Sequence, residues 1–234
     1  MTSGQTSTAN QTSTGQTKAA IVTGASKGIG AAIARRLARD GIAVVVNYAR
    51  GQAEAEALVR AIEADGGKAI AVQADIADPT GIANLFDAGE KAFGGIDILV
   101  NNAGIMRLSP IAHAAEHAAE IDRDLGIEEG VVGLYQPGYG VYAATKAAVE
   151  AMTHILAKEL GARRITVNAV APGPVETALF TDGKSAAQIE AIGNMIPLGR
   201  LGQPDDIAGV VSFLAGPDSG WVNGQIIRAN GGVI

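Results

Sequence analysis

The sequence contains no cysteine, few aromatic residues and no cluster of basic residues. The lack of cysteine excludes disulfides, thiolate metal ligands and a cysteine nucleophile. The net charge of −6, with lysine and arginine scattered along the chain, argues against a nucleic-acid partner. No apolar run approaches the roughly 18 residues of a membrane span. No signal peptide is recognisable either, so we expect a cytoplasmic protein without membrane contact.

Aromatic residues make up only 4% of the chain, although 47% is hydrophobic. The core must therefore consist of alanine, valine, isoleucine and leucine, which is typical of buried parallel strands covered by helices. The 31 glycines are too many for a helical bundle and follow no collagen period, so they indicate many tight strand-to-helix turns.

Short apolar runs alternate with amphipathic segments from Lys18 onwards. The expected strands are residues 19–22, 44–46, 70–74, 96–100, 165–170 and 225–227. The expected helices are residues 28–40, 53–65, 79–93 and 142–160, and one after Pro204. This alternation predicts an α/β fold, a Rossmann-type doubly wound parallel sheet forming a single domain over residues 18–234. Residues 1–17 are polar and uncharged, and we expect a disordered tail.

A glycine-rich turn follows the first expected strand, with Gly24, Gly28 and Gly30 in the spacing G-x-x-x-G-x-G. The first two glycines permit a sharp turn and the close approach of a pyrophosphate to the backbone. Gly30 lets the helix pack tightly on the strand, and the positive end of the helix attracts the anion. The turn predicts a dinucleotide site. The alternative is a turn that only connects two elements.

The second strand indicates which dinucleotide is bound. A free ribose 2′-hydroxyl usually meets an acidic residue at this strand end, but here the sequence is Asn47-Tyr48-Ala49-Arg50. Arg50 and Lys27 are placed to contact a 2′-phosphate instead. The sequence therefore favours NADP over NAD. The alternative is that both cations are ordinary solvated side chains.

Three further motifs follow in order: Asn101-Asn102-Ala103-Gly104, Tyr142 with Lys146, and Pro172-Gly173-Pro174-Val175-Glu176-Thr177. With these motifs the chain resembles the short-chain dehydrogenase/reductase family, and in particular its 3-oxoacyl-carrier-protein reductase-like members. The resemblance covers residues 18–106 and 131–234. It implies a small-molecule carbonyl or alcohol as substrate, reduction of a 3-oxoacyl thioester or small ketone by NADPH, and a homodimer or homotetramer.

The resemblance also implies the site residues. Tyr142 and Lys146 would be catalytic, and no metal is expected. The cofactor would contact both of these and Gly24, Ser26, Lys27, Gly28, Ile29, Gly30, Asn47, Tyr48, Arg50, Asp75, Ile76, Asn102, Ala103, Gly104, Pro172, Gly173, Val175 and Thr177. Thr177 has an alternative role as a capping hydroxyl in its loop. Residues 176–198 are expected to cover the substrate.

The spacing of Tyr142 and Lys146 fits acid–base chemistry. The two residues are one helical turn apart, so their side chains leave the same face of the expected helix. A phenol with a pKa near ~10 is a poor catalyst at neutral pH, but a neighbouring ammonium group favours the phenolate. Tyr142 could then donate a proton to a carbonyl oxygen. The alternative is a tyrosine that only packs on the sheet.

Two family residues are missing. The family has a serine about a dozen residues before the tyrosine and an asparagine on the preceding helix, yet residues 110–141 contain no serine, threonine or asparagine. Glu129 and Gly130 stand at the serine's spacing. Losing one such hydrogen-bond donor typically costs about 10²–10³ in rate. The alternative function is therefore a cofactor-binding protein with weak or no catalysis.

The interval from Asn101 to Tyr142 is also short, by about 25 residues of the usual helix and strand. Residues 111–124 could form a shortened helix, and residues 127–134 are left for a fifth strand. A further alternative is that the native protein carries an additional segment here. His113, Glu116 and His117 match H-x-x-E-H, a zinc pattern, but an exposed alanine-rich helix face is the favoured interpretation.

Overall fold

The computed structural model describes residues 17–104 and 140–234. Several sequence predictions lie outside these residues. They are the disordered tail except Thr17, the helix at residues 111–124, the strand at residues 127–134 and the histidine–glutamate pattern. No helix of the described residues combines the length and the apolarity needed to cross a membrane.

The central sheet has four parallel strands in the order β3-β2-β1-β4. They are β1 (Ala19–Val22), β2 (Ala43–Tyr48), β3 (Ala69–Gln73) and β4 (Ile98–Val100). Every residue of β1 and β2 is buried, because these strands are covered on both faces. Their continuous apolar sequences are typical of such strands.

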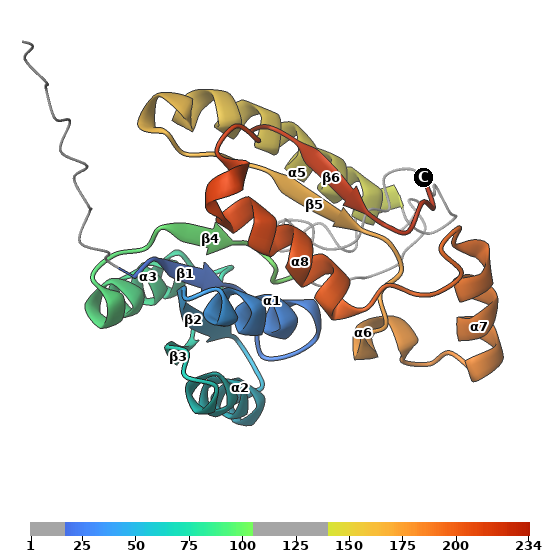
Figure 1. The fold of residues 1–234 in the computed structure, drawn as a ribbon, viewed down its shortest axis with the longest axis horizontal. Helices are drawn as coiled ribbons and strands as arrows, with labels where there is room; N and C mark the ends of the chain where they lie inside the picture. Colours follow the sequence, from blue (N-terminus) through green and yellow to red (C-terminus); the bar gives the residue numbers. More distant parts are fainter. Residues whose placement is uncertain (1–16, 105–139) are drawn as a thin grey trace, which may run out of the picture.

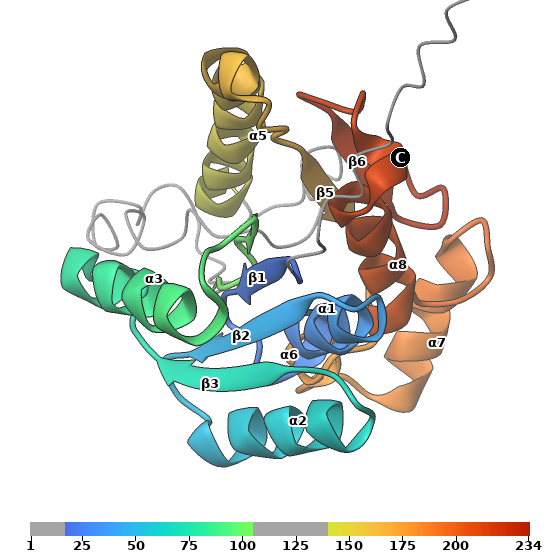
Figure 2. The same cartoon turned by 60° about the vertical axis from the view of Figure 1, so that its left-hand side comes forward.

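Helices cover both faces of this sheet. On one face, α1 (Gly28–Arg39), α2 (Gln52–Ala64) and α8 (Pro204–Ala215) contribute to the larger core cluster. On the other face, α3 (Pro79–Phe93) packs against a smaller cluster around Ile21 and Val45. The helix α3 begins as the sequence predicted, with Asp78 accepting hydrogen bonds from the N–H groups of Thr80 and Gly81. Figure 2 shows α3 and α5 on one side of the strands and α1 and α8 on the other.

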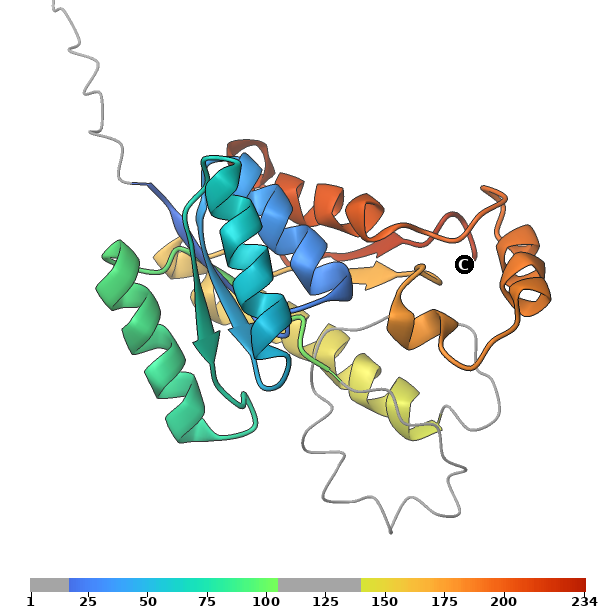
Figure 3. The ribbon, with the colours of Figure 1, turned by 90° about the horizontal axis from the view of Figure 1, so that it is seen from below.

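A second, two-stranded parallel sheet is formed by β5 (Ala169–Pro172) and β6 (Ile226–Ala229). The long helix α5 (Gly140–Leu160) and the 3₁₀ turn η2 (Gly161–Arg163) precede it. Between β5 and α8 lie α6 (Ala178–Thr181) and α7 (Ala186–Met195), and η3 (Pro217–Ser219) follows α8. Figures 1 and 3 show α6 and α7 together at the end of the molecule towards which β5 points.

The Rossmann-type fold is confirmed, because parallel strands carry helices on both faces. Within residues 17–104 and 140–234, β4 pairs with β1 and β5 pairs with β6. The strand expected at residues 127–134 lies outside these residues.

The predicted position of one strand was wrong. The expected strand at residues 165–170 is β5 at Ala169–Pro172. Ile165 and Thr166 are exposed, and the N–H of Val167 donates to Oδ1 of Asn223. These residues therefore belong to the loop that precedes β5 and not to the strand.

Candidate functional site

The turn between β1 and α1 has the sharp geometry that its glycines predicted. Gly24 has φ +61° and Gly28 has φ +57°, the left-handed region that favours glycine. A Cβ on Gly30 would stand 2.4 Å from Nδ2 of Asn102 and 2.8 Å from the carbonyl oxygen of Gly24. Each of these positions therefore requires glycine.

Asn47 supports this turn from the neighbouring strand. Its carbonyl oxygen accepts a hydrogen bond from the N–H of Ala25 (2.8 Å), and its Oδ1 accepts one from the N–H of Gly24 (3.3 Å). Its Nδ2 donates to the carbonyl oxygen of Ala74 (3.0 Å). Asn47 is only 1% exposed. It therefore holds the turn in place from the protein interior, through these hydrogen bonds.

The Asn-Asn-Ala-Gly segment after β4 lies directly against the turn. The backbone N–H groups of Asn102 and Ala103 both donate to Oγ1 of Thr23, at 2.9 and 3.0 Å. A Cβ on Gly24 would stand 2.8 Å from the Cα of Ala103. Thr23 is thus a positioning residue that the sequence-based list of site residues missed. The available signal was a hydroxyl at the end of β1, beside the asparagine motif of the next strand.

Lys27 and Arg50, which the sequence favours as contacts of a 2′-phosphate, are both exposed. Lys27 is the N-cap residue of α1, and Arg50 lies in the loop that follows the buried end of β2 at Tyr48. Ser26 and Gly51, which adjoin these cations in the sequence, are in close contact, since a Cβ on Gly51 would stand 3.3 Å from the serine Oγ. The backbone segments that carry Lys27 and Arg50 are therefore close together.

Glu54, which is not one of the predicted site residues, lies in the first turn of α2, and its carboxylate would lie 3.2 Å from a Cβ on Gly51. The structure places three of the predicted site residues as follows. Asp75 is exposed after β3, where its Oδ1 accepts from the N–H of Ala77 (2.9 Å). Ile76 is half-buried beside the smaller core cluster, and Ile29 packs against the larger one.

Tyr142 and Lys146 lie together in the first part of α5, as their spacing predicted. The Nζ of Lys146 is 5.1 Å from the centroid of the Tyr142 ring, within the range of a cation–π interaction. Both side chains are buried, with 1% and 7% exposed. The amino end of α5 lies towards the same side of the molecule as the carboxyl ends of β4, β5 and β6 (Figure 1).

The segment after β5 reaches the glycine turn. Thr177 Cγ2 stands 3.7 Å from the position of a Cβ on Gly28, so the two segments are in van der Waals contact. Thr177 also caps α6, because its Oγ1 accepts from the N–H of Phe180 (3.3 Å). Pro172 and Val175 are buried, and Gly173 packs closely against Asn230. The capping role of Thr177 is confirmed, and its contact with the cofactor stays a prediction.

Backbone hydrogen bonds join the two ends of the segment from Glu176 to Gly202. The N–H of Glu176 donates to the carbonyl oxygen of Gly202 (2.8 Å), and the N–H of Gly202 donates to that of Pro174 (2.9 Å). Next to this bridge, Nη1 of Arg200 lies 2.6 Å from Oδ2 of Asp206. The hydrogen bonds from Arg200, followed by one from the N–H of Gln203, hold the pKa of Asp206 below its usual range.

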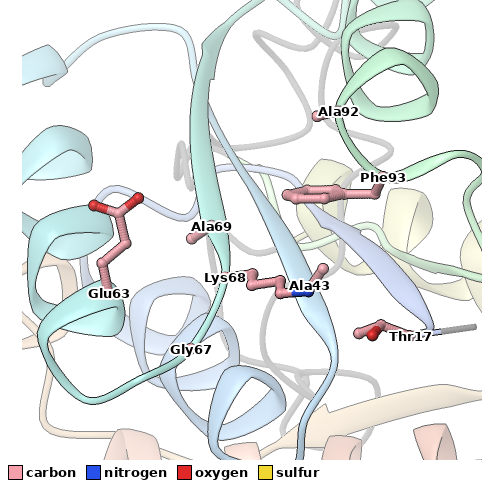
Figure 4. A pocket seen from close by; sticks show the side chains of 8 residues that line it. All are labelled: Thr17, Ala43, Glu63, Gly67, Lys68, Ala69, Ala92 and Phe93. Carbon is pink, nitrogen blue, oxygen red and sulfur yellow. The ribbon is translucent and has the colours of Figure 1, made fainter.

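The cavities lined by the described residues include one between two strands of different sheets and one at the edge of the central sheet. The larger, about 880 Å³, lies between β4 and β5 and includes Asn101 and Asn102 in its wall. The smaller, about 400 Å³, lies at the amino ends of β2 and β3, with Phe93 and Lys68 at its wall (Figure 4). The glycine turn lies at the carboxyl end of β1, whereas the smaller cavity lies at the amino ends of the parallel strands. The smaller cavity is therefore separate from the predicted site. Residues 17–104 and 140–234 contain no group of three histidine, aspartate or glutamate side chains that could hold a metal ion.

Comparison with known proteins assigns the family. Residues 18–124 match the model of the short chain dehydrogenases, and residues 130–234 match the model described as enoyl-(acyl carrier protein) reductase. An uncharacterized oxidoreductase of Methylorubrum extorquens is 45% identical over 241 residues, covering 92% of this chain and 97% of its own. The 3-oxoacyl-acyl-carrier-protein reductase FabG of Staphylococcus aureus is 39% identical over 242 residues, covering 93% and 98%.

Among solved structures, a short chain dehydrogenase from Burkholderia cenocepacia in complex with NADP superposes with a TM-score of 0.82 at 39% identity, covering 92% of this chain and 97% of its own. The protein therefore belongs to the short-chain dehydrogenase/reductase family of oxidoreductases, as its motifs indicated.

The alignment with the Methylorubrum protein also shows by how many residues this chain is shorter than a relative. The alignment with the Methylorubrum protein spans 241 positions, whereas 92% of this 234-residue chain is about 215 residues, so about 26 positions have no residue of this chain. This agrees with the shortening inferred from the spacing of the motifs.

Proposed function

We propose that the protein binds NADP(H) in the turn between β1 and α1 and reduces a carbonyl group to an alcohol. The observation that supports cofactor binding best is the turn itself, with two glycines at positive φ and a third whose Cβ would clash with Asn102. Lys27 and Arg50 are the groups that would meet a 2′-phosphate, and β2 ends without an acidic residue. The NADP complex of the Burkholderia relative agrees with this choice of cofactor.

The cofactor, when bound, supplies the hydride. This chain's own residues would handle the proton. Tyr142 donates its phenolic proton to the carbonyl oxygen, and the ammonium group of Lys146, 5.1 Å from the ring centroid, stabilises the phenolate that remains. The segment from Glu176 to Gly202, closed at its base, would cover the substrate. Relatives named as 3-oxoacyl-acyl-carrier-protein reductases favour a 3-oxoacyl thioester or a small ketone as the substrate class.

A second candidate function is cofactor binding with little or no turnover. It is favoured by the absence of serine, threonine and asparagine from residues 110–141, together with about 26 missing positions. Without a hydroxyl donor to the substrate oxygen, the rate would fall by about 10²–10³.

One experiment separates the two functions. NADPH is titrated into the protein and followed by its fluorescence, and turnover is then assayed on a panel of ketones and 3-oxoacyl thioesters. Saturable binding with oxidation of NADPH supports the reductase. Saturable binding without oxidation on any substrate supports the second function. The absence of saturable binding contradicts both.

A further inference from the structure

The carboxylate of Glu54 lies beside the loop that would receive the 2′-phosphate of NADP. Its side chain is exposed and belongs to the first turn of α2. A Cβ on Gly51 would stand 3.2 Å from Oε2 of Glu54 and 3.3 Å from Oγ of Ser26. One small space beside Gly51 is therefore bounded by the carboxylate of α2 and by a hydroxyl of the glycine turn.

The two predicted phosphate contacts adjoin the same space. Lys27 follows Ser26 in the sequence, and Arg50 precedes Gly51. A phosphate that reached both cations would have to lie near the contact between Ser26 and Gly51. It would therefore come close to the carboxylate of Glu54, which has the same sign of charge.

The charge of Glu54 has no partner among the described residues. The basic residues that form ion pairs in this part of the chain are Arg36, Arg60 and Arg200, and none of them pairs with Glu54. On the same helix, by contrast, the carboxylate of Glu56 lies 3.8 Å from Arg60. No described cation therefore neutralises the carboxylate beside the loop.

We infer that Glu54 is a cofactor-selectivity residue that opposes Lys27 and Arg50, an inference that rests on the proposed function. Its carboxylate repels a 2′-phosphate, since a phosphate monoester carries about −1.5 to −2 charges at neutral pH. The same carboxylate accepts a hydrogen bond from the free 2′-hydroxyl of NADH, which is the usual role of the acidic residue that β2 lacks. The protein therefore prefers NADPH by less than its two cations alone would give.

A purely structural role for Glu54 makes a different prediction. An acidic residue in the first turn of a helix stabilises the helix through its dipole. Loss of that effect lowers the melting temperature and leaves the choice between ligands unchanged. Glutamine keeps the size of the side chain and a hydrogen-bond acceptor, so Glu54→Gln removes the charge alone.

The direct test measures the Kd of adenosine 2′,5′-bisphosphate and of AMP for the full-length protein by calorimetry. The two probes differ only in the 2′-phosphate, and neither is turned over. We expect Glu54→Gln to lower the Kd of the bisphosphate about three- to tenfold and not to lower that of AMP. Equal shifts for both probes would overturn the inference, because the 2′-phosphate would then not be the group that Glu54 senses.

Glu63→Gln is the matched control for the change in net charge. Glu63 is also an exposed glutamate of α2. It lies nine residues further along the helix, about 14 Å away, where salt screens most of its effect. We expect the Kd of the bisphosphate to stay unchanged in this variant. Equal effects of the two variants would overturn the inference in favour of a general effect of net charge.

A double variant tests whether the repulsion is direct. In an Arg50→Ala background, Glu54→Gln should still tighten binding of the bisphosphate, because carboxylate and phosphate repel each other without the arginine. If the gain disappears, Glu54 acts only by competing for Arg50, and the inferred contact with the phosphate is wrong.

Fluorescence titration with NADPH and NADH separates this inference from the proposed function. If the unaltered protein binds NADPH and Glu54→Gln keeps the same ratio of the two Kd values, the cofactor assignment stands and the inference about Glu54 fails. If neither cofactor binds to the unaltered protein, both fail. A ratio that shifts towards NADPH in Glu54→Gln supports both.

Discussion

Thr23 accepts two hydrogen bonds from Asn102. The backbone N–H of Asn102 donates to Oγ1 of Thr23, and Nδ2 of Asn102 donates to the carbonyl oxygen of Thr23, each at 2.9 Å. Both residues are buried. The pair ties the carboxyl end of β1 to that of β4, so the start of the glycine turn and the Asn-Asn-Ala-Gly segment are fixed relative to each other.

Replacing Thr23 by valine should therefore destabilise the protein. Valine keeps the shape but leaves the buried N–H of Asn102 and the partly buried N–H of Ala103 without their acceptor, which costs about 1–3 kcal/mol. Urea unfolding measures the loss. Thr23→Ser, which retains the hydroxyl, should recover most of it, and equal losses in both variants would show that the methyl group matters instead.

Replacing Gly30 by alanine should disrupt the turn. The new Cβ would stand 2.4 Å from Nδ2 of Asn102 and 2.8 Å from the carbonyl oxygen of Gly24, and such overpacking costs about 1–3 kcal/mol. Gly95→Ala is the matched control, since no atom lies within 4 Å of its Cβ position. We expect a lower melting temperature and weaker NADPH binding for Gly30→Ala only. A variant that binds NADPH normally would contradict the assigned cofactor turn.

Replacing Lys27 or Arg50 by alanine should weaken NADPH binding selectively. A charge-assisted hydrogen bond is worth about 1.5–3 kcal/mol, so each variant should raise the Kd for NADPH by about ten- to a hundredfold. The Kd for NADH, which lacks the 2′-phosphate, should stay unchanged. Arg60→Ala, an exposed arginine of α2, is the control. Equal effects on both cofactors would assign the cations to another part of the nucleotide.

Replacing Tyr142 by phenylalanine should abolish carbonyl reduction and leave NADPH binding intact. The ring still packs beside Lys146, but the proton donor is gone, which typically lowers the rate by about 10²–10⁴. Stopped-flow oxidation of NADPH and fluorescence titration measure the two effects separately. If the variant reduces ketones at the original rate, the phenol of Tyr142 is not the acid.

The pair of Arg200 and Asp206 should contribute to stability in a pH-dependent way. Because the guanidinium of Arg200 lowers the pKa of Asp206 in the folded state, the contribution is present above the ordinary aspartate range and is lost as the pH falls through the lowered value. The pair is largely exposed and screened by solvent, so its contribution to stability is small.

Urea midpoints between about pH 7 and pH 3 measure this dependence. Asp206→Asn should be less stable at neutral pH and should lose less stability on acidification. Asp205→Asn, which removes the neighbouring carboxylate of the same helix turn, should retain the original acid dependence. A parallel response of the two variants would exclude the pair as its source.

The first half of the fold could be predicted from the sequence because its signals are local. Gly24 and Gly28 adopt the positive φ that their positions in the turn demanded, and Asp78 and Pro79 begin α3 as expected. The roles of Thr23 and Asn47 depend on contacts between strands that are 20 to 80 residues apart, so no local pattern shows them.

The second half was predicted less well for the same physical reason. Ile165 is β-branched and apolar, which is typical of a strand, yet it lies outside β5 because the pairing with β6 begins only at Ala169.

The bridge between Glu176 and Gly202 makes the intervening residues leave and return at one point of the framework. Loops closed in this way tolerate insertions and deletions without rearrangement of the strands. Thr177, at the start of the segment, is the residue that contacts the glycine turn. Grafting the corresponding stretch of a relative between Thr177 and Gln203 should therefore transfer that relative's substrate preference while keeping this chain's cofactor preference.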